Sequence, residues 1–94
     1  MRNDAWLAAV AAAVREADPG VECADVDADT TTFARGNAVV VAHVRDGMAM
    51  LVPSIDHGGG AWHAERVMHG AQVAFACESS TIGMAAAAVE ELLR

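Results

Sequence analysis

A β-hairpin is predicted by the segment Ala38-Val-Val-Val-Ala-His-Val-Arg-Asp-Gly-Met-Ala-Met-Leu-Val52. Residues Ala38 to Val44 are apolar on both faces of an extended chain, as in a central strand that is covered on both sides. Asp46-Gly47 suits a tight turn because both residue types tolerate positive φ. Met48 to Val52 is then the returning strand, and we expect Pro53 to end it because proline cannot donate to the ladder.

Helical periodicity marks both ends of the chain. From Asn3 or Asp4, either of which can cap a helix, apolar residues recur at helical spacing up to Asp18-Pro19-Gly20. Proline cannot continue the hydrogen-bond ladder, so the first helix ends there. A second helix is predicted after a hydroxyl cap within residues 79–81, and its buried stripe consists of Ile82, Ala85, Ala86, Val89, Leu92 and Leu93.

Two further strands precede the hairpin. They cover Val21 to Val26 and Thr30 to Arg35, and they flank an acidic turn. The three consecutive threonines at the start of the second strand favour extended backbone.

The segment from Ala61 to Cys77 is compatible with two structures. As strands, residues 61–68 and 71–77 would form a hairpin around His69-Gly70, and as a helix the segment would carry an apolar stripe interrupted by that glycine. The clean alternation of the second half favours the hairpin.

These elements predict a single α+β domain over residues 1–94. We expect an antiparallel sheet of four to six strands, joined as a meander or as hairpins, with the N- and C-terminal helices packed on one face. A chain of 94 residues supports one core, and much of its 54% hydrophobic content is alanine, which buries little area. We therefore expect a thin core and a homodimer in which alanine-rich helices approach closely.

The formal net charge is −7, and because the chain has no lysine, six arginines supply every fixed positive side chain. Binding to a nucleic-acid backbone needs clustered lysine and arginine, so we expect no direct nucleic-acid binding. The apolar run over residues 5–14 is too short to span a bilayer, and no signal-peptide pattern is present. We therefore expect a cytoplasmic protein with no membrane association and two free thiols, Cys23 and Cys77.

Acidic residues dominate the segment between the first helix and the second predicted strand. Six acids and no base lie between Arg15 and Arg35. Asp25, Asp27 and Asp29 occupy alternate positions, so an extended strand would place their three carboxylates on one face, about 6.6 Å apart. A solvent-facing row of this kind attracts a basic protein partner. Our candidate partner-binding residues are Asp25, Asp27, Asp29 and Glu22.

A second candidate site contains His57, His63 and Glu65 beside the loop Gly58–Gly60. It supports an alternative hypothesis, a small enzyme or a ligand- or metal-binding domain. His63-Ala64-Glu65 resembles the start of the zinc site of cytidine deaminases, but that site needs two further cysteines in a Pro-Cys-x-x-Cys arrangement, which the chain lacks. On an extended strand His63 and His69 would lie about 20 Å apart, so we expect no bound metal and no cofactor.

The remaining motifs supply no catalytic residue. The acidic segment partly matches a calcium loop, but that motif needs glycine and glutamate where this chain has Thr30 and Gly36. No nucleophile elbow or ordered triad is present. The sequence therefore favours a small acidic, non-enzymatic interaction module, such as an inhibitor, an immunity protein, a secretion chaperone or a phage-encoded antagonist, including a nucleic-acid mimic.

We predict that protein purified without a histidine tag holds no stoichiometric metal, because two plausible ligands do not make a tight tetrahedral site. Elemental analysis after dialysis should find well under one equivalent per chain. One zinc per chain that His63→Ala removes would favour the alternative hypothesis instead.

Overall fold

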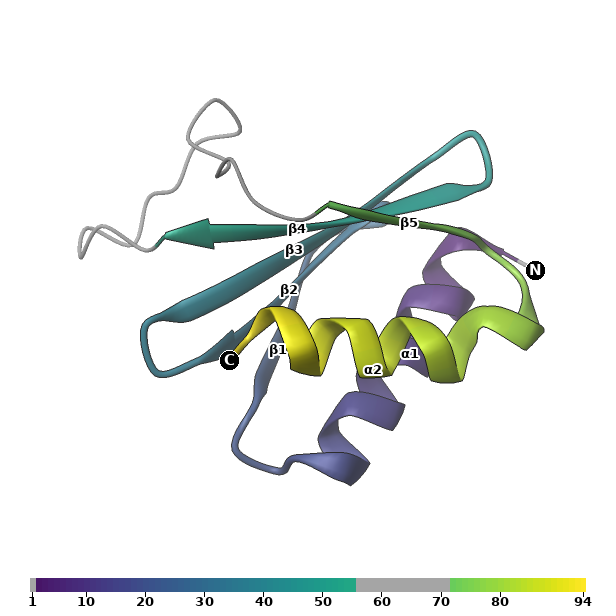
Figure 1. Ribbon diagram of the computed structural model, residues 1–94. Helices are drawn as coiled ribbons and strands as arrows, with labels where there is room; N and C mark the ends of the chain where they lie inside the picture. Colours follow the sequence, from purple (N-terminus) through teal and green to yellow (C-terminus); the bar gives the residue numbers. More distant parts are fainter. Residues whose placement is uncertain (1, 56–71) are drawn as a thin grey trace.

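The computed structural model describes residues 2–55 and 72–94 (Figure 1). Five strands form one antiparallel sheet in the order β1-β2-β3-β4-β5. The predicted α+β class, with a strand meander between two terminal helices, is confirmed. The elements are α1 (Asn3–Ala17), β1 (Glu22–Asp27), β2 (Thr30–Arg35), β3 (Ala38–Arg45), β4 (Met48–Ile55), β5 (Val73–Ala76), a single 3-10 turn η2 (Ser79–Thr81) and α2 (Ile82–Leu92).

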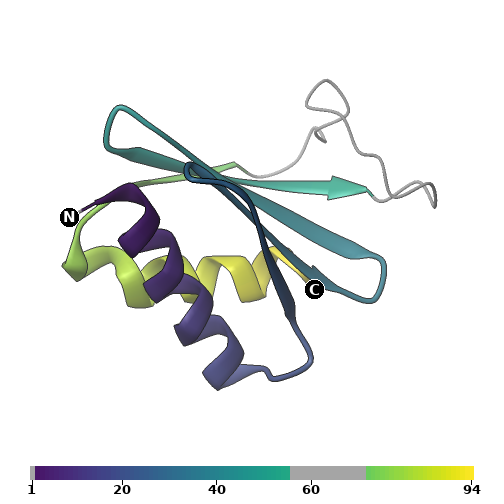
Figure 2. The same cartoon turned by 180° about the vertical axis from the view of Figure 1, so that it is seen from behind.

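Both helices lie on the same face of the sheet (Figures 1 and 2). Alternate strand residues point toward the helices and pack against the apolar stripes of α1 and α2. The largest fully buried side chains of this core include Trp6, Val10 and Val14 from α1, Phe33, Val40 and Leu51 from the sheet, and Val89 from α2.

The expectation that β3 is covered on both sides is wrong for the described elements, because no described helix lies on the second face (Figure 2). Val41 points to that face and does not belong to the helix-side core, yet it is only 5% exposed. Its neighbours across the sheet are Thr32 and Val52. No described layer therefore accounts for the apolar residues on this face of β3.

Tight turns join the central strands. Asp46 and Gly47 have φ angles of 54° and 76°, so the β3–β4 connection is the positive-φ turn that the Asp-Gly pair predicted. Gly36, with φ 61°, starts the turn between β2 and β3. The flanking residues, Arg35 and Ala38, pair directly across that turn.

The prediction that Pro53 ends β4 is wrong, because the strand continues to Ile55. Pairs flanking a two-residue turn are hydrogen-bonded, and bonded and non-bonded pairs then alternate along the ladder. The pairing of Val40 with Pro53 falls on a non-bonded position, so proline loses no bond to β3. On its other side, pairing with β5 ends at Leu51 within the described residues. Proline is tolerated because its missing N–H faces away from a partner strand.

The strand predicted over residues 71–77 is confirmed by β5, which pairs antiparallel with β4. The helical alternative is therefore wrong for residues 73–76. The first strand of the predicted hairpin, residues 61–68, and its turn at His69-Gly70 lie outside the described residues.

A hydrogen-bonded tryptophan joins α1 to the start of α2. The Trp6 side chain is fully buried, and its Nε1 donates to the Glu78 carbonyl at 3.1 Å and to Thr81 Oγ1 at 2.9 Å. The Thr81 hydroxyl lies 2.7 Å from the carbonyls of Ala76 and Glu78, to which it can donate. The predicted hydroxyl cap is therefore absent at Thr81, because its oxygen satisfies the indole of α1 instead.

Arg35 contacts the C-terminal ends of both helices. Its guanidinium donates to Asp18 Oδ2 at 2.7 Å, just after α1, and to the Leu93 carbonyl at 3.2 Å, just after α2. The hydrogen bond from Arg35, together with one from the Gly20 backbone N–H, holds the pKa of Asp18 below its usual range. Arg35 therefore links the end of β2 to both helices.

We predict that Thr81→Val destabilises the protein by about 1 kcal/mol or more, because it removes a hydrogen-bond partner of a buried indole N–H. Urea unfolding followed by tryptophan fluorescence measures the change. Thr81→Ser keeps the hydroxyl and is the matched control. Equal stability of the valine and serine variants would contradict the role given to this hydroxyl.

Asp18→Asn should lower stability at neutral pH and flatten the pH dependence below it. The pKa of Asp18 is lower in the folded state, so its stabilising effect is present above the unfolded pKa and disappears as pH falls through the folded pKa. Urea midpoints of the variant and wild type, measured from pH 7 to pH 2, should converge at the acid end. Glu16→Gln, an exposed acid on α1, is the control. A difference that stays constant with pH would overturn the assignment.

Candidate interaction surfaces

The three alternating aspartates do not lie on one strand face as expected. Asp25 and Asp27 belong to β1, whereas Asp29 lies in the turn that follows it. The pairing register shifts between Asp25 and Asp27, so the alternation of side chains is interrupted there. The Asp27 carboxylate then accepts a hydrogen bond from the Asp29 backbone N–H at 2.8 Å, a local bond that favours a turn over a continuing strand.

The fold adds a fourth carboxylate to this end of the molecule. Asp4, in the first turn of α1, lines a hollow of about 270 Å³ together with Asp25 and Asp27. An adjoining hollow is lined by Asp4 and Asp29, with Arg2 on its edge. We call Asp4, Asp25, Asp27 and Asp29 the acidic cluster. Sequence analysis missed Asp4 because only helix packing brings the start of α1 to the β1–β2 turn.

Glu22 does not join the acidic cluster. It pairs with Ala34 at the first position of β1, whereas Asp27 pairs with Thr30 at the last position of that strand. Five residues of strand therefore separate Glu22 from the turn. The structure brings together three of the four candidate partner-binding residues and leaves this one exposed at the other end.

The acidic cluster is exposed and lightly paired. Arg2 lies 3.1 Å from the Asp4 carboxylate, but both side chains are largely exposed, so this ion pair contributes little. The Thr31 hydroxyl donates to Asp25 Oδ1 at 3.2 Å. Asp27 Oδ1 accepts the Asp29 N–H. Asp25 Oδ2 and Asp27 Oδ2 have no partner among the described residues. The cluster is therefore a negatively charged surface that remains available to a partner.

The described part of the chain contains no group of three or more histidine, cysteine or acidic side chains placed to hold a metal ion. The alternative site, His57, His63 and Glu65 with the loop Gly58–Gly60, lies outside the described residues.

Both cysteines are free, as expected. Cys77 is buried and Cys23 is partly buried. Burial raises the pKa of both thiols, so neither has the lowered pKa of a nucleophilic cysteine.

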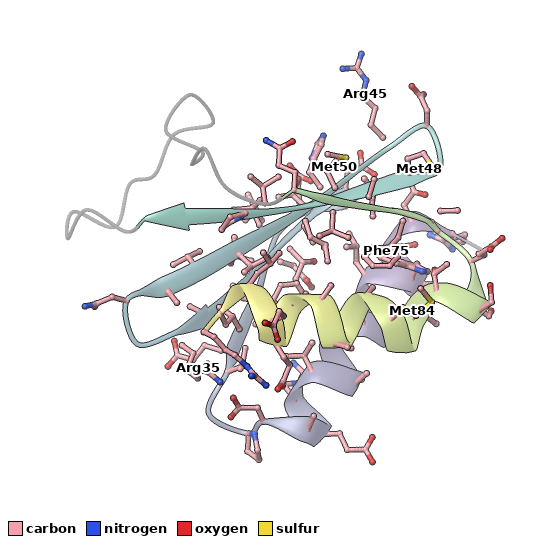
Figure 3. All side chains as sticks on the ribbon, viewed as in Figure 1. Arg35, Arg45, Met48, Met50, Phe75 and Met84 are labelled. Carbon is pink, nitrogen blue, oxygen red and sulfur yellow. The ribbon has the colours of Figure 1, made fainter. Side chains whose placement is uncertain are left out.

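A second surface is the sheet face that points away from the helices. In Figure 3, Met48 and Met50 lie on this side, whereas Phe75 points toward the helices. Adjacent strands place their side chains there in register, as in the row Thr30, His43, Met50 and Ala74. We call it the open sheet face, formed by Ala24, Thr30, Thr32, Ala34, Val39, Val41, His43, Met48, Met50, Val52, Ala74 and Ala76, with Glu22, Asp27 and Arg45 at its margins.

The centre of the open sheet face is mostly apolar. Its polar residues are Thr30, Thr32 and His43; the Thr30 hydroxyl lies 2.8 Å from His43 Nδ1, and the Thr32 hydroxyl donates to the Ala24 carbonyl at 3.4 Å. Among the described side chains that β2, β3 and β4 direct to this face, Arg45 at the end of β3 is the only fixed charge. Met48 is 44% exposed at the same end. Such a face is unusual on the surface of an isolated antiparallel sheet, where polar residues normally point to water.

The third surface is a shallow groove of about 490 Å³ between the two helices. Small residues line it, including Ala13 of α1 and Ala86 of α2. Its edge carries Glu90 and Glu91, and only the second is paired, to Arg94 at 3.7 Å. This is the alanine-rich surface on which sequence analysis placed a dimer contact.

No protein-family model, curated protein or solved structure matches this chain. Neither described helix has the length and hydropathy needed to cross a membrane.

Proposed function

We propose that this protein is a small, non-enzymatic interaction module that binds a basic surface on a protein partner through the acidic cluster. The observation that carries the proposal is the convergence of four aspartates from α1, β1 and the β1–β2 turn around adjoining hollows, with Arg2 as the one basic residue among the described residues that line them. Four carboxylates with one base create a local negative potential that attracts cationic side chains.

The turn that carries the cluster is held in place. The Asp29 carbonyl accepts a hydrogen bond from the Val44 N–H of β3 at 2.8 Å. Within the turn, the Asp27 carboxylate accepts a hydrogen bond from the Asp29 N–H. A turn bonded to the central strand loses little further entropy when a partner binds. The carboxylates are therefore presented in a preorganised arrangement rather than on a free loop.

The net charge of −7 extends this local field over the whole molecule. Charge complementarity of this kind mainly accelerates association and makes it sensitive to salt. These properties suit an inhibitor, an immunity protein, a secretion chaperone or a phage-encoded antagonist, and a nucleic-acid mimic is the most specific member of that group. A cytoplasmic location belongs to the proposal and agrees with two unpaired cysteines.

A ¹⁵N NMR titration with an octa-arginine peptide tests the proposed surface. The largest shift changes should fall on α1 residues around Asp4 and on the β1–β2 turn. The triple variant Asp25→Asn, Asp27→Asn, Asp29→Asn should weaken binding roughly tenfold, from about 0.5 kcal/mol for each exposed charge pair. It should also reduce the salt dependence of binding. Asparagine preserves the side-chain acceptor at position 27, so the turn should survive.

The matched control removes three exposed acids elsewhere, as Glu16→Gln, Asp46→Asn and Glu91→Gln. It leaves the same net charge as the test variant. If the control loses as much affinity as the test variant, binding follows net charge and the acidic cluster is not a binding surface. Circular dichroism of both variants verifies that each is folded.

A further inference from the structure

The open sheet face has the composition of a surface that is covered by protein. Its centre consists of Val39, Val41 and Val52 with small residues on the flanking strands, Ala34 and Ala74 among them. Charged residues lie at its margins, with Glu22 and Asp27 on β1 and Arg45 at the end of β3. An apolar centre with a polar rim is the usual anatomy of a protein interface.

We propose that a second copy of this chain covers the open sheet face, so that two sheets pack face to face about 10 Å apart, as in a β-sandwich. This inference does not depend on the partner proposed for the acidic cluster; Asp27 belongs both to that cluster and to the rim of the face. The result is a two-layer sheet core with the helices of each copy on the outside.

The available area agrees with a dimer. Five strands at a spacing of about 4.8 Å span about 24 Å, and β3 from Val39 to Arg45 extends about 20 Å. Four strands of that length, together with β5, whose four residues extend about 13 Å, cover about 450 Å² per copy, or about 900 Å² for the pair, before the relief of the side chains is counted. Specific interfaces begin at about 1,000 to 1,200 Å² of buried surface. A dimer through this face reaches that range only when the whole face is used and the relief of its side chains adds to the buried area.

The charge at the rim of the face favours a second copy. Its rim carries charges of both signs, so two copies of this acidic chain can meet without opposing only carboxylates. The helix groove is less suitable, because two copies would bring together two acids from each copy, Glu90 and Glu91, with Arg94 as the arginine that lines the groove in each copy.

Methionine substitutions give a matched test by sedimentation equilibrium. Wild type should have twice the 9.7 kDa chain mass at tens of micromolar. Met50→Lys, on the open sheet face, should raise the dimer dissociation constant about a hundredfold, because two-fold symmetry buries two unpaired ammonium groups. Met84→Lys is the control, since Met84 is 64% exposed on α2. It should leave the dimer intact.

A measurement on the unsubstituted protein keeps the test valid if Met50→Lys fails to fold. In protein labelled with ¹³C at the methionine methyl groups, Met48 and Met50 signals should move on dilution through the dissociation constant, whereas Met84 should not. The proposal is overturned if wild type is a monomer at 100 µM, or if only Met84→Lys dissolves the dimer. It is also overturned if the Met50 signal does not shift on dilution. In that case, protection of the Met50 methyl group from a paramagnetic cosolute would show that the face is covered within one chain.

Discussion

The pairing register of the strands is the constraint on which the rest of the structure depends. Turns of two residues at Gly36-Asn37 and Asp46-Gly47 leave no freedom to slide β2, β3 and β4 past one another. A slip of one residue would exchange the two faces of every strand. Phe33, Val40 and Leu51 therefore all point to the helices, while the alternate residues of the same strands all point away.

This sorting explains why the molecule has two surfaces of different chemistry. The helix side is closed by apolar packing and by two polar links, Trp6 to Thr81 at one end and Arg35 to Asp18 at the other. The irregular end of β1 then brings three aspartates beside the first turn of α1, and charge accumulates there. The opposite side of the sheet keeps valine and methionine without a described layer above them. A charged end and an apolar face on one small chain are consistent with two separate contacts, one steered by charge and one stabilised by burial.

Local chemistry accounts for the elements that sequence analysis predicted well. Asp46-Gly47 specifies its turn because both residues tolerate a positive φ angle. Asp18-Pro19-Gly20 ends α1 because proline cannot continue the helical hydrogen bonds, a local effect that requires no tertiary contact. Two of the failures have a cause in common. Pro53 remains in its strand because of where its missing N–H points, and Thr81 gives up capping because an indole from α1 reaches it. Both outcomes depend on a neighbour that is distant in sequence.

The same division applies to the candidate surfaces. The sequence by itself determined the fold class, the central hairpin, the two helices and an excess of acids near β1, because each follows from residue spacing, turn chemistry or charge. Only the tertiary structure decided that Asp4 joins Asp25, Asp27 and Asp29 while Glu22 does not, since helix docking and a strand irregularity set those positions. It also decided that both helices cover one face. An alternating or continuous apolar pattern states that a residue avoids water, but the layer that shields it is chosen by how distant elements pack.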